Sequence, residues 1–135
     1  NVPMRFFIII VLVLFSTNSF AHHPGHKVEV APPFPSVNLE IMKDSVDGYN
    51  LYIDLKNFNL APDLVGKENQ SNTGYLSLYV NDIKIARVYS QWFHIPQRFF
   101  YLKENLVKVT LNTNLNGEFT LDGETIQSVL KVINN

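Results

Sequence analysis

Four histidines are the residues whose type and spacing suggest chemistry in this chain. His22, His23 and His26 lie within five positions of one another, and His94 lies far along the sequence. A neutral imidazole nitrogen is a common protein ligand for copper and zinc, and ligation by nitrogen alone favours copper. We therefore predict a metal site with His22, His94, His23 and His26 as candidate ligands and copper as the metal.

The segment before His22 predicts that this residue becomes the N-terminus of the mature protein. Residues 4–21 begin with one positive charge at Arg5, continue with an apolar run and end with small and polar residues up to Ala21. This order is typical of a secretory signal peptide. Cleavage after Ala21 would give His22 a free α-amine beside its imidazole. Together these two groups could chelate copper as a brace, with His94 as a distant third donor.

The histidines also have an interpretation without a metal, in which three of them belong to an extended leader and His94 is packed or half-exposed. Residues 22–36 contain four prolines, too many for a helix or a central strand. One of them, Pro24, removes a backbone N–H at the third position of the expected mature chain, where an N-terminal copper chelate would use it. Both interpretations stay open.

The signal peptide predicts an exported protein, periplasmic or secreted. Its apolar run covers residues 6–15, about half of the ~20 residues that a membrane-spanning helix needs. We therefore expect no stable membrane anchor after cleavage. The chain has no cysteine, which excludes disulfides, thiolate metal sites and a cysteine nucleophile. An ordinary packed core must then stabilise the exported domain.

Alternation of apolar and polar residues predicts strands over residues 37–135. Turn signals such as Asp47-Gly48, Asn81-Asp82 and Asp122-Gly123 separate the alternating segments, and no segment has the apolar stripe of a helix. The pattern predicts an all-β domain, an immunoglobulin-like antiparallel β-sandwich of about seven strands. The expected strands are residues 37–42, 49–56, 75–80, 83–89, 107–112, 119–121 and 126–133.

Six aromatic residues near the middle of the chain have two interpretations. If exposed, they would form a stacking platform for a sugar or an apolar patch for a protein partner. If buried, they would close one end of the sandwich, and with Pro96 among them we expect them to be mostly buried. The six are Tyr89, Trp92, Phe93, Phe99, Phe100 and Tyr101.

Charge and motifs narrow the function classes. The formal net charge is −1, or −2 without Arg5, which gives no electrostatic reason for nucleic-acid binding. No nucleophile motif, phosphate-binding loop or dinucleotide fingerprint occurs, so we expect no enzyme. The sequence predicts an exported, non-catalytic binding protein, with a periplasmic copper-binding module as the first hypothesis. The alternative is a structural, protein-binding or carbohydrate-binding domain without a metal.

Several short motifs occur together in the body of the chain: residues 57–62, residues 74–81 and Trp92-Phe93-His94. They resemble those of a family of small exported bacterial β-sandwich proteins of uncharacterised function. In that family two histidines stand at the positions of Tyr75 and Ser77, on one face of a strand. The resemblance implies that such a pair and His94 would form an imidazole metal site. This chain carries only His94 of that set.

Overall fold

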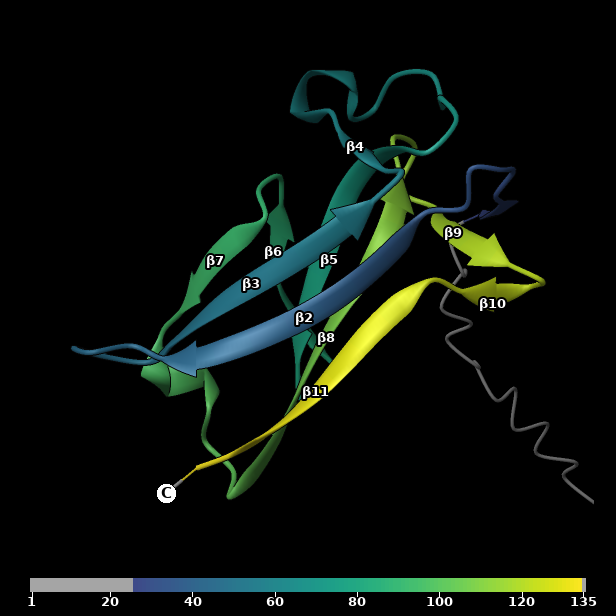
Figure 1. Cartoon of the computed structure of the whole chain (residues 1–135). Coiled ribbons are helices and arrows are strands. Elements are labelled where there is room, and N and C mark those ends of the chain that lie inside the picture. Colours follow the sequence, from purple (N-terminus) through teal and green to yellow (C-terminus); the bar gives the residue numbers. More distant parts are fainter. Residues whose placement is uncertain (1–25, 135) are drawn as a thin grey trace, which may run out of the picture.

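Two β-sheets packed face to face form residues 26–134, the part of the chain that the computed structural model describes (Figure 1). The smaller sheet has the strand order β2-β3-β7. In the larger sheet β5 and β8 pair at the centre, β4 and β6 pair with β5, β9 and β11 pair with β8, and β1 and β10 pair with β9. The strands are β1 (Lys27–Glu29), β2 (Ser36–Lys43), β3 (Tyr49–Lys56), β4 (Asn59–Leu60), β5 (Thr73–Val80), β6 (Ile83–Val88), β7 (Trp92–Ile95), β8 (Glu104–Thr113), β9 (Glu118–Leu121), β10 (Glu124–Thr125) and β11 (Gln127–Ile133).

The prediction of an all-β sandwich is confirmed, but the number and pairing of the strands differ from it. The described residues form eleven strands instead of about seven, and three of these have only two or three residues. Two pairs, β1–β9 and β4–β5, are parallel, so the sandwich is not purely antiparallel. Strands of two or three residues are too short for alternation to reveal them. No helix in residues 26–134 is long and apolar enough to cross a membrane.

Left-handed backbone conformations at the turns explain the hairpins that the sequence predicts. Asn81 and Asp82 between β5 and β6 have φ of 52° and 64°. A common two-residue hairpin turn requires positive φ at both of its central residues. Asp122 and Gly123 repeat this arrangement between β9 and β10, with φ of 52° and 79°. The Asp47-Gly48 turn joins β2 and β3, which pair from Ser36–Lys56 at one end to Lys43–Tyr49 at the other.

A single hydrophobic core fills the space between the two sheets. Alternate residues of the long strands point into it, so that Leu39, Ile53 and Leu78 are buried while their sequence neighbours on β2 and β3 face outward. Burying one side chain of this size contributes about 1.5–3 kcal/mol to folding. Because the core covers only the inner face of each sheet, the two outer faces are available to bind a ligand or a partner.

The second half of the expected leader packs on the sandwich. Strand β1 pairs with β9, the Val30 amide donates to the carbonyl oxygen of Thr120 at 2.9 Å, and the Val30 side chain joins the core. The Glu29 carboxylate accepts hydrogen bonds from the Thr120 hydroxyl at 2.6 Å and the Gly123 amide at 3.1 Å. These hydrogen bonds lower the pKa of Glu29 below its ordinary value. Strand β1 and Glu29 therefore attach this part of the leader to the sandwich.

Candidate functional site

The structure does not bring His26 and His94 together. His26 directly precedes β1, and its carbonyl oxygen accepts a hydrogen bond from the Glu118 amide of β9 at 3.1 Å. His94 lies on β7 of the smaller sheet, on the opposite side of the molecule (Figure 1). The other two candidates, His22 and His23, lie outside the described residues, as does the expected signal peptide. The copper brace therefore stays a prediction.

No metal site is assembled elsewhere in residues 26–134, where no group of three or more histidine, cysteine, aspartate or glutamate side chains could hold an ion. The positions of Tyr75 and Ser77 do not change this. They point outward from β5 of the larger sheet, because Leu76 and Leu78 between and after them enter the core. His94 points outward from the other sheet, so these three positions face opposite outer surfaces.

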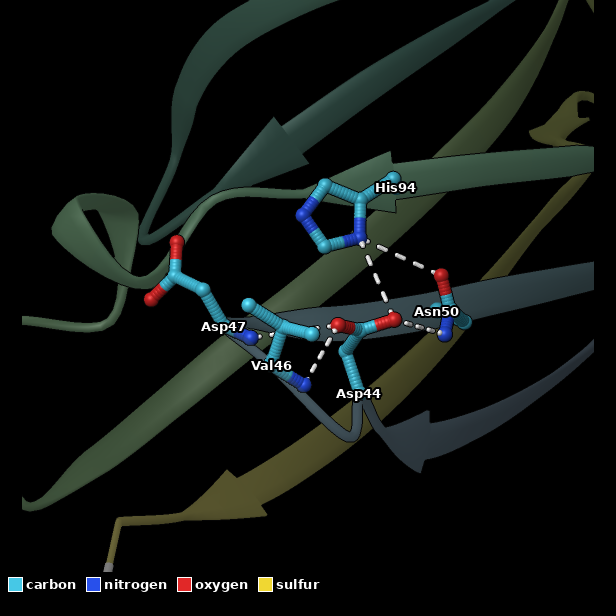
Figure 2. Close-up of polar contacts among 5 residues, drawn as sticks. All are labelled: Asp44, Val46, Asp47, Asn50 and His94. Atoms are coloured by element: carbon cyan, nitrogen blue, oxygen red, sulfur yellow. Dashed lines mark hydrogen bonds and ion pairs between the residues drawn. The ribbon is translucent and has the colours of Figure 1, made fainter.

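His94 forms a small polar network at the end of β7 (Figure 2). It pairs with Asn50 of β3 across the sheet, and its Nδ1 lies 3.2 Å from the Asn50 side-chain oxygen and 4.0 Å from the Asp44 carboxylate. Because an amide oxygen can only accept, Nδ1 carries the proton in this contact and Nε2 is the unprotonated nitrogen of the neutral ring. Nε2 makes no hydrogen bond to any described residue, so a ligand could donate to it.

Asp44 anchors this network from the turn between β2 and β3. Its carboxylate accepts hydrogen bonds from the backbone amides of Val46 at 3.0 Å and Asp47 at 3.1 Å, and from the Asn50 side-chain amide at 2.8 Å (Figure 2). These donors, with a smaller contribution from His94 in its protonated form, lower the pKa of Asp44 to about 2. The carboxylate is thus ionised at neutral pH and already accepts three hydrogen bonds within the protein. Its role is to stabilise the turn between β2 and β3.

An exposed row of side chains crosses the outer face of the smaller sheet beside His94. Trp92 of β7 pairs with Tyr52 of β3, and Tyr52 pairs with Glu40 of β2. Trp92 is 51% exposed and Tyr52 is 42% exposed. Adjacent strands lie about 4.8 Å apart, so the row spans about 10 Å across the sheet. Two aromatic rings and a carboxylate are therefore presented together on a rigid surface.

A shallow depression of about 440 Å³ lies next to Tyr52 on the same face. It is lined by the amide side chains of Asn38 and Gln91 and by the carboxylates of Glu40 and Asp54. Within the described residues, no lysine, arginine or histidine nitrogen lies within 4.0 Å of either carboxylate. The acidic aromatic face, as we call this surface, consists of Asn38, Glu40, Tyr52, Asp54, Gln91 and Trp92.

The expectation that the central aromatic residues are mostly buried is wrong for half of them. Phe100 is buried, and Phe93 and Phe99 are half-buried, whereas the other three are exposed. The strands expected from the sequence do not include Trp92 and His94, which lie on β7. The alternation of Trp92 and His94 with the inward-pointing Phe93 and Ile95 was the signal that could have placed both on an outer strand face. The exposed residues are Tyr89, Trp92 and Tyr101.

The acidic aromatic face can bind a ligand without any covalent step. Aromatic ring faces stack on flat apolar groups or on cations, and carboxylates and amides accept or donate hydrogen bonds at the ligand's polar edges. A scan against protein-family models, a search of curated proteins and a search of solved structures each found no match for this chain. The geometry of this face is therefore the feature of the molecule that points to a function.

Proposed function

We propose that the protein is an exported, non-catalytic binding module that holds a carbohydrate chain on the acidic aromatic face. One observation carries the proposal: Tyr52 and Trp92 lie directly opposite each other on neighbouring strands, both exposed, beside a depression lined by amides and carboxylates. Both rings are exposed on the outer face of the sheet, so packing of the core does not explain why large aromatic residues occupy these two positions.

The chemistry of a sugar matches these groups. A pyranose ring presents flat C–H surfaces that stack on aromatic rings, and its hydroxyl groups donate hydrogen bonds at the edges. Hydrogen bonds from hydroxyls to an ionised carboxylate such as Glu40 or Asp54 are stronger than those to neutral acceptors. Asn38 and Gln91 supply both donors and acceptors. The row across three strands suits an extended ligand that crosses the sheet.

The same features argue against the competing ligands at this face. A stable protein interface needs a desolvated apolar centre, whereas here the two rings are flanked by two unpaired carboxylates and two amides. An anionic partner would be repelled by Glu40 and Asp54. Copper binding by the amine and imidazole of His22 is a separate proposal, because it depends on residues before His26.

Binding to polysaccharides tests this proposal. The mature chain is incubated with insoluble cellulose, chitin and xylan, and with soluble glucans in affinity gels, and the bound fraction is measured. We expect Trp92→Ala and Tyr52→Ala each to weaken binding at least about fivefold, which corresponds to roughly 1 kcal/mol. Both side chains are exposed, so the melting temperature should change little.

Tyr101→Ala is the matched control for these two variants. Tyr101 is 62% exposed but is not part of the acidic aromatic face, so its replacement should leave glycan binding within about twofold. Failure of the wild-type chain to bind any of these glycans would overturn the proposal. Equal losses in the Tyr101 and Trp92 variants would also overturn it, because the effect would then not belong to the acidic aromatic face.

A further inference from the structure

The outer face of the larger sheet carries the opposite charge. Leu76 and Leu78 of β5 enter the core, so Tyr75, Ser77 and Tyr79 point outward. Strand pairing places Arg87 of β6 beside Ser77, and Lys84 and Lys108 on either side of Tyr79. We call this surface the cationic tyrosine face; it consists of Tyr75, Ser77, Tyr79, Lys84, Arg87 and Lys108.

The cations of this face lie over tyrosine rings. The Arg87 guanidinium carbon is 4.4 Å from the centroid of the Tyr75 ring, and the Lys84 ammonium nitrogen is 5.4 Å from the same centroid. The Lys108 nitrogen is 4.6 Å from the centroid of the Tyr79 ring. Each distance is within the range of a cation–π interaction. The long basic side chains are therefore held in place by the rings below them.

A shared hydrogen-bond acceptor fixes the arrangement further. The Tyr75 hydroxyl donates to the side-chain oxygen of Asn116 at 2.9 Å, and the Arg87 guanidinium donates to the same oxygen at 3.2 Å. Tyr75 is only 1% exposed, since the basic side chains cover it. The guanidinium retains further N–H donors beyond this contact. Arg87 is thus oriented before any ligand arrives.

The positive charges of Lys84 and Arg87 are not paired with carboxylates of residues 26–134. No carboxylate of the described residues lies within 4.0 Å of Lys84 or Arg87. The pKa of Lys84 is lowered from its ordinary value by burial and by repulsion from Arg87. Lys108 has one acidic neighbour, Asp82, at 3.9 Å, but that side chain is 86% exposed and pairs weakly. Two cations that converge without a counter-charge favour the arrival of an anion.

Ser77 is a buried polar residue at the same place. It is fully buried on the outward side of β5, between Arg87 of β6 and Thr110 of β8 in the register. Its hydroxyl has no hydrogen-bond partner among the residues that the structure describes. Buried polar groups of this kind are commonly hydrogen-bonded to an ordered water. Because the hydroxyl is closed to a surface ligand, the contacts with a ligand come from the cations around it.

We propose that the cationic tyrosine face binds an acidic polysaccharide through its carboxylate or sulfate groups. Arg87 and Lys84 engage one oxyanion together, and Lys108 engages the next along the chain. The planar guanidinium offers two parallel hydrogen bonds to a carboxylate, and the ammonium adds a point charge. This site is separate from the acidic aromatic face and does not depend on the function proposed there.

The chemistry of the face favours a polysaccharide over an acidic protein. An acidic protein would need an apolar anchor in addition to its charges, but both tyrosine rings are already covered by cations. The groups exposed beside them are the Asn116 side chain and the Tyr89 ring, whose centroid lies 6.5 Å from that of Tyr75. An amide can hydrogen-bond the hydroxyl groups of a sugar chain, and an aromatic ring can stack on its C–H face.

Charge-matched variants test the proposal in the mature full-length chain. Binding to polygalacturonate, dextran sulfate and uncharged dextran is measured by titration calorimetry at low and moderate salt. We expect the first two to bind with affinity that falls as salt rises. Uncharged dextran carries no oxyanion, so any binding of it at the acidic aromatic face should not depend on salt or on Lys84 and Arg87. The double variant Lys84→Gln with Arg87→Gln should lose at least about tenfold in affinity because both groups contact one oxyanion. Lys108→Gln should lose less.

Lys43→Gln with Lys67→Gln is the control, because it removes the same charge from exposed lysines outside this face. It should retain affinity within about twofold. An equal loss in this control would overturn the proposal, since only net charge would then matter. Polyglutamate bound as tightly as polygalacturonate would overturn the choice of a polysaccharide in favour of an acidic protein. Trp92→Ala should leave polygalacturonate binding unchanged, which separates this site from the acidic aromatic face.

Discussion

At the scale of single residues, Asp44 shows how local hydrogen bonding changes the role that a sequence suggests. An acidic residue beside a turn is expected to be a solvated surface charge, and Asp47 fits that description because it is exposed. Asp44 instead accepts three hydrogen bonds and joins the turn to Asn50 and His94. The sequence contains both acids, but only the folded turn distinguishes them.

The first prediction concerns the pH dependence of stability at Asp44. Its pKa is about 2 in the folded protein, below the ordinary value of 3.8 for an unfolded aspartate. A lowered pKa stabilises the folded state above the unfolded pKa, and this stabilisation is lost as the pH falls through about 2. We expect Asp44→Asn to be less stable than the wild type at pH 7. The difference should shrink between about pH 4 and pH 2.

Urea unfolding of both proteins at several pH values measures this difference. Asp47→Asn is the matched control, because it removes the same charge from the same turn while its carboxylate accepts no hydrogen bond from the described residues. The control should stay close to the wild type at pH 7. A difference between wild type and Asp44→Asn that is constant down to pH 2 would contradict the role of the ionised carboxylate.

At the scale of elements, the turn between β2 and β3 is joined to β7. Gly48 is buried, has φ of +68°, and accepts a hydrogen bond from the Asp44 amide at 2.9 Å. A Cβ atom added at Gly48 would lie 2.2 Å from the carbonyl oxygen of Ile95, the last residue of β7. The Asp-Gly signal predicts the turn. It cannot predict that a strand 47 positions later packs against it.

The second prediction compares two glycines with similar backbone conformations. Gly123 has φ of +79°, and apart from its chain neighbours no atom of the described residues lies within 4 Å of an added Cβ. The change Gly123→Ala therefore costs only the left-handed conformation, about 1–2 kcal/mol. Gly48→Ala adds a clash with the backbone of Ile95, so we expect it to destabilise the protein clearly more. It should also displace β7 and with it His94 and Trp92. Denaturant unfolding measures both variants, and equal losses would show that Gly48 does not pack against β7.

At the scale of the whole molecule, alternation along the chain predicts the long strands because their inward faces are apolar. Residues 37–42 and 49–56 correspond to β2 and β3, and Asp47-Gly48 is the turn between them. Alternation does not predict strand β7, since it has only four residues and Pro96 follows it. It does not predict the parallel pairing of β1 with β9 either, because this pairing joins segments about 90 residues apart.

The two outer faces depend on the register between strands more than on any local pattern. Lys84, Arg87 and Lys108 come from two different strands and converge on tyrosines of a third. Likewise Glu40, Tyr52 and Trp92 form a row only because β2, β3 and β7 pair in that register. A net charge close to zero hides this separation of an acidic face from a basic one.

The last prediction concerns the N-terminus that cleavage of the expected signal peptide would create. Cleavage after Ala21 should give a mature protein that begins with His22, as mass spectrometry of the exported fraction would show. The free amine and imidazole of His22 should then bind Cu(II) more tightly than the same protein with one extra residue before His22. Both donors must be deprotonated, so binding should weaken as the imidazole protonates near pH ~6.5.

The structure sharpens this experiment through the placement of the other histidines. His26 lies beside β9 and His94 lies on β7 of the other sheet, with its Nδ1 directed to Asn50. We therefore expect His94→Ala to reduce copper affinity less than the one-residue extension does. A loss in His94→Ala as large as that caused by the extension would show that the leader reaches across the sandwich to form a brace. Equal affinity of the cleaved and extended proteins would show that the amine of His22 is not a ligand, and copper would then be bound only by scattered imidazoles.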